Sequence, residues 1–289
     1  MAIKFKSGAP PIATPLATVA PRAKLGLTLP EEPNVPSSVL SDYTMLLYGA
    51  KKIGKTSLAS RFPNAIFLAL EPGTKALSVF SRPVKNFNEL LEYVELLEKD
   101  TRFATIVVDT VDIAYEYAFE YICKKKSIAH PSEEDDFGAT WGEIKAEFKK
   151  IVLRLMSIGK GIIFISHDTE RKIELRDGKE VERVQPTMSS QAMGVVEALV
   201  DIIMNYSYDG NDRILRLDGS HTLVAGNRIE EHFIRKGGAP RMPGDKIRAI
   251  HMGLTSQEAY NNFINAFNNE QDVTDPTEIP KTPTMILRK

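Results

Sequence analysis

The sequence has few residues of several chemically distinctive kinds. Its 289 residues include one cysteine and one tryptophan, and the formal net charge at pH 7 is −1. A single cysteine cannot form an internal disulfide, which fits a reducing cytoplasm. Because three lysines follow Cys123, we expect it at the surface rather than in the pocket of a nucleophile. The near-neutral charge excludes a uniformly basic coat for nucleic acid but still allows a basic groove.

Long hydrophobic runs are also absent. No apolar stretch approaches the ~20 residues that cross a bilayer, and the first residues lack the apolar segment of a secretory signal. We therefore expect a cytoplasmic protein with no membrane partner.

The five histidines lack the spacing of a metal site. The hydrophobic fraction of 43% is ordinary for a globular protein. The length suits one large α/β domain with tails, or two small domains.

Composition divides the chain into three parts. Residues 1–41 are rich in Pro, Ala, Thr and Ser and indicate a disordered or extended arm. Residues 42–240 alternate apolar runs with helical patterns, which predicts an α/β core with a mostly parallel sheet and helices on both faces. Residues 241–289 contain one predicted helix, 256–267, and then a polar tail that we expect to be flexible. The predicted strands are 45–48, 65–70, 105–109, 161–166, 200–206 and 213–217, and the other predicted helices are 88–99, 112–125 and 141–157.

The most specific motif follows the first predicted strand. Residues 49–56 read Gly-Ala-Lys-Lys-Ile-Gly-Lys-Thr, which is the full pattern of a phosphate-binding loop. In such a loop the backbone N–H groups cradle phosphates, Lys55 reaches the β- and γ-phosphate oxygens, and the Thr56 hydroxyl ligates Mg²⁺. The motif predicts a nucleoside triphosphate site, the alternative being a glycine turn without a ligand. The predicted nucleotide-binding residues here are Gly49, Ala50, Lys51, Lys52, Ile53, Gly54, Lys55, Thr56 and Ser57.

Three more strand ends carry side chains suited to triphosphate hydrolysis. Asp109 has the form of a Walker B aspartate that holds Mg²⁺, although a carboxylate that merely ends a buried strand fits too. Many NTPases place a catalytic glutamate next, but Thr110 stands there. Glu71 is positioned to activate water, because ligands bind outside the carboxyl ends of parallel strands; an acidic residue before a turn is equally common. Ser166 and His167 end a third strand, where they either sense the γ-phosphate or cap the strand.

In combination these features resemble a known family. They are the loop at 49–56, Glu71, Asp109, the helix start Trp141-Gly142 and the strand end Ile165-Ser166-His167. Over about residues 43–236 the chain resembles the RecA-type ATPase core. It is similar in particular to phage-encoded RecA-like P-loop ATPases, the AAA-domain proteins of the Sak single-strand annealing and recombination group.

The resemblance implies a catalytic role and cofactors. Glu71 is implied as the general base, with Lys55 at the phosphates and ATP and Mg²⁺ as cofactors. No base-reading motif such as Asn-Lys-x-Asp is present, so ATP rather than GTP follows from the resemblance alone. If a phage encodes the chain, its cytoplasm is that of the host cell.

The resemblance also implies that residues 168–190 replace a DNA-binding loop. Cations there could contact phosphates, but carboxylates nearly cancel their charge, and no aromatic residue is available for base stacking. Residues 172–184 also have the pattern of a hairpin that turns at Asp177-Gly178. A solvated hairpin with both charge signs is an equally good interpretation. The predicted DNA contacts are Arg171, Lys172, Met188, Ser189 and Gln191.

The last implication concerns assembly. In RecA filaments ATP lies between protomers, and basic residues of one subunit reach the neighbour's triphosphate. Residues 224–229 resemble that segment, so Arg228 is a predicted catalytic residue acting in trans, with an ordinary exposed arginine as the alternative. We therefore predict a Mg-dependent, DNA-stimulated ATPase of phage recombination. It would anneal or exchange single-stranded DNA, form a filament or ring, and work with a single-strand-binding protein. The alternative is an adaptor or structural ATPase of phage replication or packaging without direct DNA activity.

Overall fold

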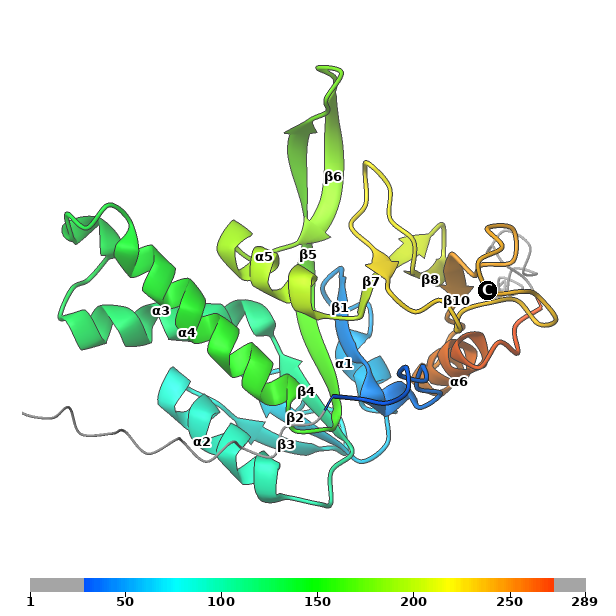
Figure 1. Ribbon diagram of the computed structural model, residues 1–289, viewed down its shortest axis with the longest axis horizontal. Helices are drawn as coiled ribbons and strands as arrows, with labels where there is room; N and C mark the ends of the chain where they lie inside the picture. The colour runs from blue at the N-terminus through cyan, green and yellow to red at the C-terminus, as the bar shows by residue number, and fades with distance from the viewer. Residues whose placement is uncertain (1–28, 273–289) are drawn as a thin grey trace, which may run out of the picture. The chain divides into compact units, whose positions relative to one another are not determined.

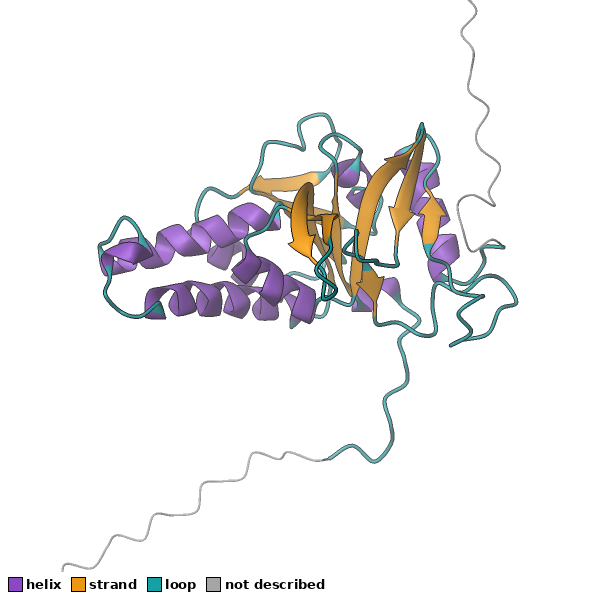
Figure 2. Ribbon diagram, turned by 90° about the horizontal axis from the view of Figure 1, so that it is seen from above, coloured by secondary structure: helices purple, strands orange, loops and turns teal. Residues whose placement is uncertain are grey.

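The buried apolar strands form one sheet in the order β10-β8-β7-β1-β5-β4-β2-β3 (Figures 1 and 2). The computed structural model describes residues 29–272, so residues 1–28 of the predicted arm (1–41) and residues 273–289 of the predicted C-terminal part (241–289) lie outside the described residues. The elements below belong to the unit that begins at Ser37. The strands are β1 (Thr44–Gly49), β2 (Ala65–Ala69), β3 (Phe80–Pro83), β4 (Thr105–Asp109), β5 (Gly161–Glu174), β6 (Glu180–Pro186), β7 (Ile202–Asp209), β8 (Asp212–Arg216), β9 (Gly226–Asn227) and β10 (Ala249–His251).

The sheet is mostly parallel, as expected from its apolar strands. β1 lies at its centre with every residue buried, and it pairs in parallel with β5 on one side and β7 on the other. Parallel pairing continues outward from β5 through β4 and β2 to β3. β8 and β10 are added antiparallel at the opposite edge. Burial on both faces explains why these strands are almost continuously hydrophobic.

Helices cover both faces of the sheet, which confirms the predicted α/β fold. Successive side chains along a strand point to opposite faces of the sheet. Leu46 and Tyr48 therefore belong to one core cluster, and Met45 and Leu47 belong to another. The first cluster includes α2 (Phe87–Lys99), α3 (Val111–Lys126), α4 (Ala139–Met156) and α5 (Ser190–Leu199), and the second includes α1 (Lys55–Ala59) and α6 (Ser256–Phe267).

None of the helices within residues 29–272 combines the length and apolarity needed to cross a bilayer.

Three sequence expectations need correction. The boundary drawn at residue 240 falls inside one structural unit, because β10 pairs with β8 and α6 packs near α1. β3 and β10 were missed since they are short, and β3 is largely exposed. Cys123 is buried, with 4% of its surface exposed, rather than at the surface. Each helical residue turns about 100° from the last, so the lysines that follow Cys123 do not determine which way it faces.

A two-stranded hairpin extends from the sheet (Figure 1). β5 continues beyond its buried first half and pairs antiparallel with β6, from Asp168 opposite Pro186 to Glu174 opposite Glu180. The Gly178 N–H donates to the carbonyl of Leu175 in the connecting turn. The hairpin predicted at 172–184 is therefore present, and it is longer than predicted.

Candidate functional site

The phosphate-binding loop joins β1 to α1 at the carboxyl edge of the sheet. Its first residue, Gly49, is opposite Tyr206 of β7, and a Cβ atom at Gly49 would lie 1.9 Å from the Tyr206 carbonyl oxygen. Only glycine fits this close approach. At the other end of the loop, Gly54 has a φ of 114° and forms the N-cap of α1. The sequence motif therefore has the strand, loop and helix context that a phosphate site requires.

Lys55 folds back over the loop. Its Nζ donates to the carbonyl oxygens of Gly49 at 2.6 Å and Ala50 at 2.9 Å, and lies 3.3 Å from Nδ1 of His167. The residue is only 5% exposed. Burial lowers the pKa of Lys55, and nearby carboxylates, Asp168 first, act against that change. The ammonium is thus desolvated, and phosphate oxygens are better acceptors for it than the two carbonyls it now uses.

Thr56 and Asp109 form the candidate magnesium site. The Thr56 hydroxyl donates to Oδ2 of Asp109 at 2.9 Å, and Gly73 leaves open space beside both atoms. Asp109 is 6% exposed, and burial raises its pKa, opposed by the Thr56 hydrogen bond. A buried carboxylate of this kind is what a cation stabilises. These two oxygen donors fit Mg²⁺, which usually takes its remaining ligands from water and substrate phosphates.

Glu71 and His167 complete a cavity of about 280 Å³ with the loop lysine, Thr56 and Asp109. Nε2 of His167 lies 3.3 Å from Oε2 of Glu71, while the Thr110 hydroxyl donates to Oε1 at 2.9 Å. Glu71 is therefore held from two sides and still borders the cavity. Thr110, which replaces the acidic residue of many NTPases, positions the carboxylate of Glu71. No local sequence motif displays this contact, because Glu71 follows β2 and Thr110 follows β4.

Ser166 does not line this cavity, contrary to its predicted role at the γ-phosphate. Its side chain is fully buried, and its hydroxyl donates to Oδ1 of Asp112 at 3.0 Å. Thr187 donates to the same oxygen at 2.5 Å, and its backbone N–H donates to the carbonyl of His167. Ser166 therefore ties the start of α3 to the base of the hairpin, and only its neighbour His167 faces the nucleotide cavity.

The strand register separates the charges of the hairpin onto two faces. Residues directly opposite in a ladder share a face, and neighbours along a strand alternate. Arg171 is opposite Arg183, flanked by the pairs Thr169–Gln185 and Ile173–Val181, so this face has no carboxylate. We call it the arginine face. The other face carries Asp168, Glu170, Lys172, Glu174, Glu180 and Glu182.

The five predicted DNA contacts are therefore not equivalent. Arg171 is exposed on the arginine face, whereas Lys172 lies on the acidic face. Met188 is 1% exposed and packs in the core, so it cannot contact DNA in this conformation. The Ser189 hydroxyl caps α5 by accepting from the N–H of Ala192, and Gln191 accepts from the hydroxyl of Tyr115. Arg183 is one of the loop cations that the sequence offers for phosphate contacts, although not one of these five, and the register places it opposite Arg171.

Arg228 lies near the amino ends of the parallel strands, whereas the nucleotide cavity lies at their carboxyl ends. Its backbone N–H donates to the carbonyl of Asp201, just before β7, and its Nη2 donates to the carbonyl of Ala198 at 2.5 Å. The phosphate loop, in contrast, follows the carboxyl end of the parallel strand β1. Arg228 is therefore placed away from the triphosphate site of its own chain, and only a neighbouring subunit could bring the two together.

Comparisons with known proteins found a matching family model, a similar prophage protein and a similar solved structure. Residues 41–229 match the model of a family described as AAA domain. A protein of Bacillus subtilis strain 168, described as the SPbeta prophage-derived uncharacterized protein YorG, is 26% identical over 208 residues, covering 70% of this chain. The match spans 61% of that protein's own length. Among solved structures, a KaiC-like protein of Pyrococcus horikoshii OT3 is 12% identical with a TM-score of 0.41, covering 75% of this chain and 87% of that one.

Proposed function

The chain belongs to the AAA domain family, and from this premise we propose that it is a Mg-dependent, DNA-stimulated ATPase that acts on single-stranded DNA. Its role would be annealing or strand exchange in phage recombination, carried out by self-associated copies together with a single-strand-binding protein. The prophage origin of the Bacillus subtilis relative supports the phage context. The complete set of phosphate, magnesium and water-activating residues around one cavity supports hydrolysis.

We assign roles to the cavity residues from their positions. Lys55 would stabilise negative charge on the γ-phosphate, and Thr56 and Asp109 would hold Mg²⁺, which when bound would supply further positive charge at the phosphates. Glu71 orients and deprotonates the attacking water, with Thr110 fixing the direction of its carboxylate. His167 lies between Lys55 and Glu71, where it contacts both.

One observation carries the link to DNA: a single strand joins the cavity to the arginine face. His167 of β5 borders the cavity, and four residues later on the same strand Arg171 lies on the hairpin, opposite Arg183. Like charges directly opposite in a ladder repel, and phosphates of a nucleic acid backbone would relieve this repulsion. Since both ends belong to one continuous strand, occupation of the cavity can alter the orientation of the hairpin.

The central test of hydrolysis is the ATPase rate of wild type and Glu71→Gln, with and without single-stranded DNA. Removal of the general base should lower the rate by about 10²- to 10⁴-fold and leave ATP binding, measured by titration calorimetry, intact. Wild type should hydrolyse faster with DNA. A wild-type rate that DNA does not change would instead favour the alternative function, a nucleotide-dependent adaptor or structural ATPase.

The test of the arginine face is the double variant Arg171→Ala with Arg183→Ala. DNA affinity should fall for all sequences alike, and the slope of log K against log salt should become shallower by about 1.4, because each contact to a single strand contributes about 0.7. Lys172→Ala, on the acidic face of the same hairpin, is the matched control and should change the slope little. Equal effects of the two variants would contradict the assignment of DNA to the arginine face.

A further inference from the structure

The α3–α4 pair ends in a loop that presents an exposed aromatic ring. Phe137 is fully exposed, and its φ of 54° lies in the left-handed region that a bulky residue seldom adopts. A single exposed apolar side chain is common and indicates no contact by itself. Here, however, the backbone holds the ring outward at a strained residue, and strain of this kind persists only where the surrounding structure enforces it.

Hydrogen bonds and ring contacts hold the loop around Phe137. Asp136 accepts from the backbone N–H groups of Gly138 and Thr140, at 3.0 and 2.8 Å. Below it, the rings of Phe119, His130 and Trp141 pack against one another with centroid distances of 5.5 to 5.7 Å. Three exposed carboxylates directly precede the ring, while at the end of α3 Lys126 pairs with Asp136 and Glu143, and Lys124 and Lys125 are exposed. We call the ring and these three carboxylates the acidic tip. These carboxylates are Glu133, Glu134 and Asp135.

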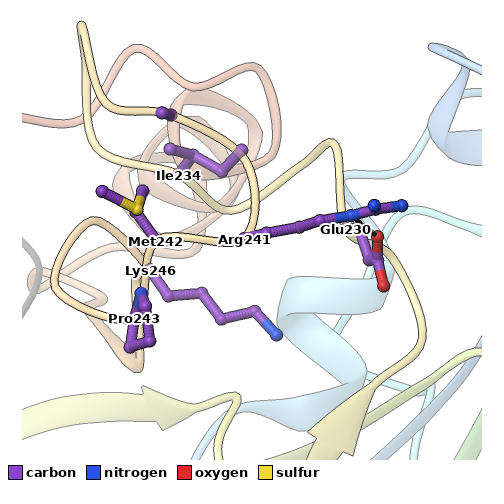
Figure 3. A pocket seen from close by; sticks show the side chains of 7 residues that line it. Glu230, Ile234, Arg241, Met242, Pro243 and Lys246 are labelled. Atoms are coloured by element: carbon purple, nitrogen blue, oxygen red, sulfur yellow. Dashed lines mark hydrogen bonds and ion pairs between the residues drawn. The ribbon is translucent and has the colours of Figure 1, made fainter.

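A cavity of about 280 Å³ lies in the segment from Glu230 to Lys246 (Figure 3). Its apolar lining comes from Ile234, Ala239, Met242 and Pro243, and Met242 is 59% exposed although it is hydrophobic. We call it the methionine pocket. A backbone bridge joins Ile234 to Lys246, so two of the residues that line the pocket are held together.

Cations border the methionine pocket. Lys246 extends along it, and Arg241 lies at its edge, where its Nε is 2.5 Å from Oε2 of Glu230 (Figure 3). Among the lining residues, Arg241 and Lys246 are cations and Glu230 is the carboxylate, so their net charge is positive. An aromatic ring inserted there would meet the Met242 sulfur and the Lys246 ammonium, and both make favourable contacts with aromatic rings.

We propose that the acidic tip of one copy inserts Phe137 into the methionine pocket of a second copy. The apolar ring matches the apolar lining, and the carboxylates of the tip match the cationic rim. In Figure 1 the free end of the α3–α4 pair lies at the left and the segment after Glu230 lies at the right, so one chain cannot join its own tip to its own pocket. The contact is therefore head to tail, which generates a ring or an open filament.

This inference rests on the self-association in the proposed function and specifies the surfaces that make it. A contact through one ring is small beside the ~800 Å² per partner of a stable interface, so we expect reversible assembly that grows with protein concentration. Sedimentation velocity of the full chain, with and without ATP and single-stranded DNA, measures it. Phe137→Ala should weaken association by about tenfold or more. Leu96→Ala, which removes another exposed apolar side chain, is the control and should change nothing.

Charge exchange tests the pairing itself. Asp135→Lys and Lys246→Glu should each impair assembly alone, and an equal mixture of the two should restore it. In the mixture every tip can meet a pocket of opposite charge, because the altered tip faces the altered pocket and the native tip faces the native pocket. Failure of the mixture to assemble would overturn the pairing, as would a wild type that stays monomeric in all states. ATP binding should be unchanged in every variant, so loss of assembly is distinguishable from a failure of the nucleotide site.

Discussion

At the scale of single residues, the nucleotide cavity contains buried charges that oppose the stability of the empty protein. Burial raises the pKa of Asp109 and lowers that of Lys55. In both cases the folded state disfavours the charged form relative to the unfolded chain. Binding of Mg²⁺ and a triphosphate would compensate both charges at once, so occupation of the site and stability of the fold should be coupled.

We therefore expect Asp109→Asn to raise the midpoint of thermal unfolding of the nucleotide-free protein at neutral pH while weakening Mg-dependent ATP binding. Because the folded pKa of Asp109 is raised, its contribution to stability is most favourable below the ordinary aspartate pKa and is lost as pH rises through the raised value. The difference between variant and wild type should thus shrink below about pH 4. Calorimetric unfolding across pH measures it, and a difference independent of pH would contradict the explanation.

The sequence predicted some of these residues well and others poorly, for a physical reason. The phosphate loop and Asp109 were found because their roles depend on local spacing, which a sequence displays directly. Glu71 was found as a strand end, but its contacts with Thr110 and His167 cross the sheet and depend on which strands are neighbours. Met188 was misjudged because polar neighbours hid a side chain that points into the core.

At the scale of elements, Tyr48 connects the strand before the phosphate loop to the hairpin. Its hydroxyl donates to the carbonyl of Val224 at 2.5 Å, and the N–H of Val224 donates to the carbonyl of Val184 in β6. Burial raises the pKa of Tyr48, which keeps the hydroxyl protonated as a donor. β1, β6 and the segment before β9 are thereby joined beside the nucleotide cavity.

Tyr48→Phe should lower the free energy of unfolding by about 1 to 3 kcal/mol, because a buried carbonyl loses its partner. Urea denaturation measures the change. The control is Tyr208→Phe, because the side chain of Tyr208 is about half exposed. Its free energy of unfolding should stay within about 0.5 kcal/mol of that of wild type. Equal losses in the two variants would show that the Tyr48 hydrogen bond is not the cause.

The elements also show where sequence patterns lose information. The buried parts of the central strands were predicted within a few residues, since burial on both faces makes them continuously apolar, but β5 runs on to Glu174, eight residues beyond its predicted end. The hairpin was predicted as a hairpin, but the separation of its charges was not, because mixed charges along a strand acquire a pattern only once the register is known. Arg171 and Arg183 are twelve positions apart in the chain and directly opposite in the ladder.

At the scale of the whole molecule, Arg228 can act on a triphosphate only if copies of the chain assemble. Arg228→Ala should then lower the ATPase rate by about 10³-fold, the smaller end of the effect of an arginine supplied in trans, while ATP affinity stays nearly the same. Mixing this variant with Lys55→Ala should recover part of the activity, since each copy retains a different half of a shared site. Absence of recovery in assembled mixtures would leave Arg228 without a role in trans.

The tight approach of β7 to the phosphate loop has a consequence for how this sequence can vary over time. At Gly49 no side chain can be accommodated, because a Cβ would overlap the carbonyl of Tyr206. The clashing atom is a backbone oxygen. Since every residue at position 206 has this atom, no substitution of Tyr206 can remove the clash. A larger residue at position 49 would be accommodated only if strands β1 and β7 moved apart. The packing of the sheet therefore requires glycine at the start of the phosphate loop, independently of nucleotide binding.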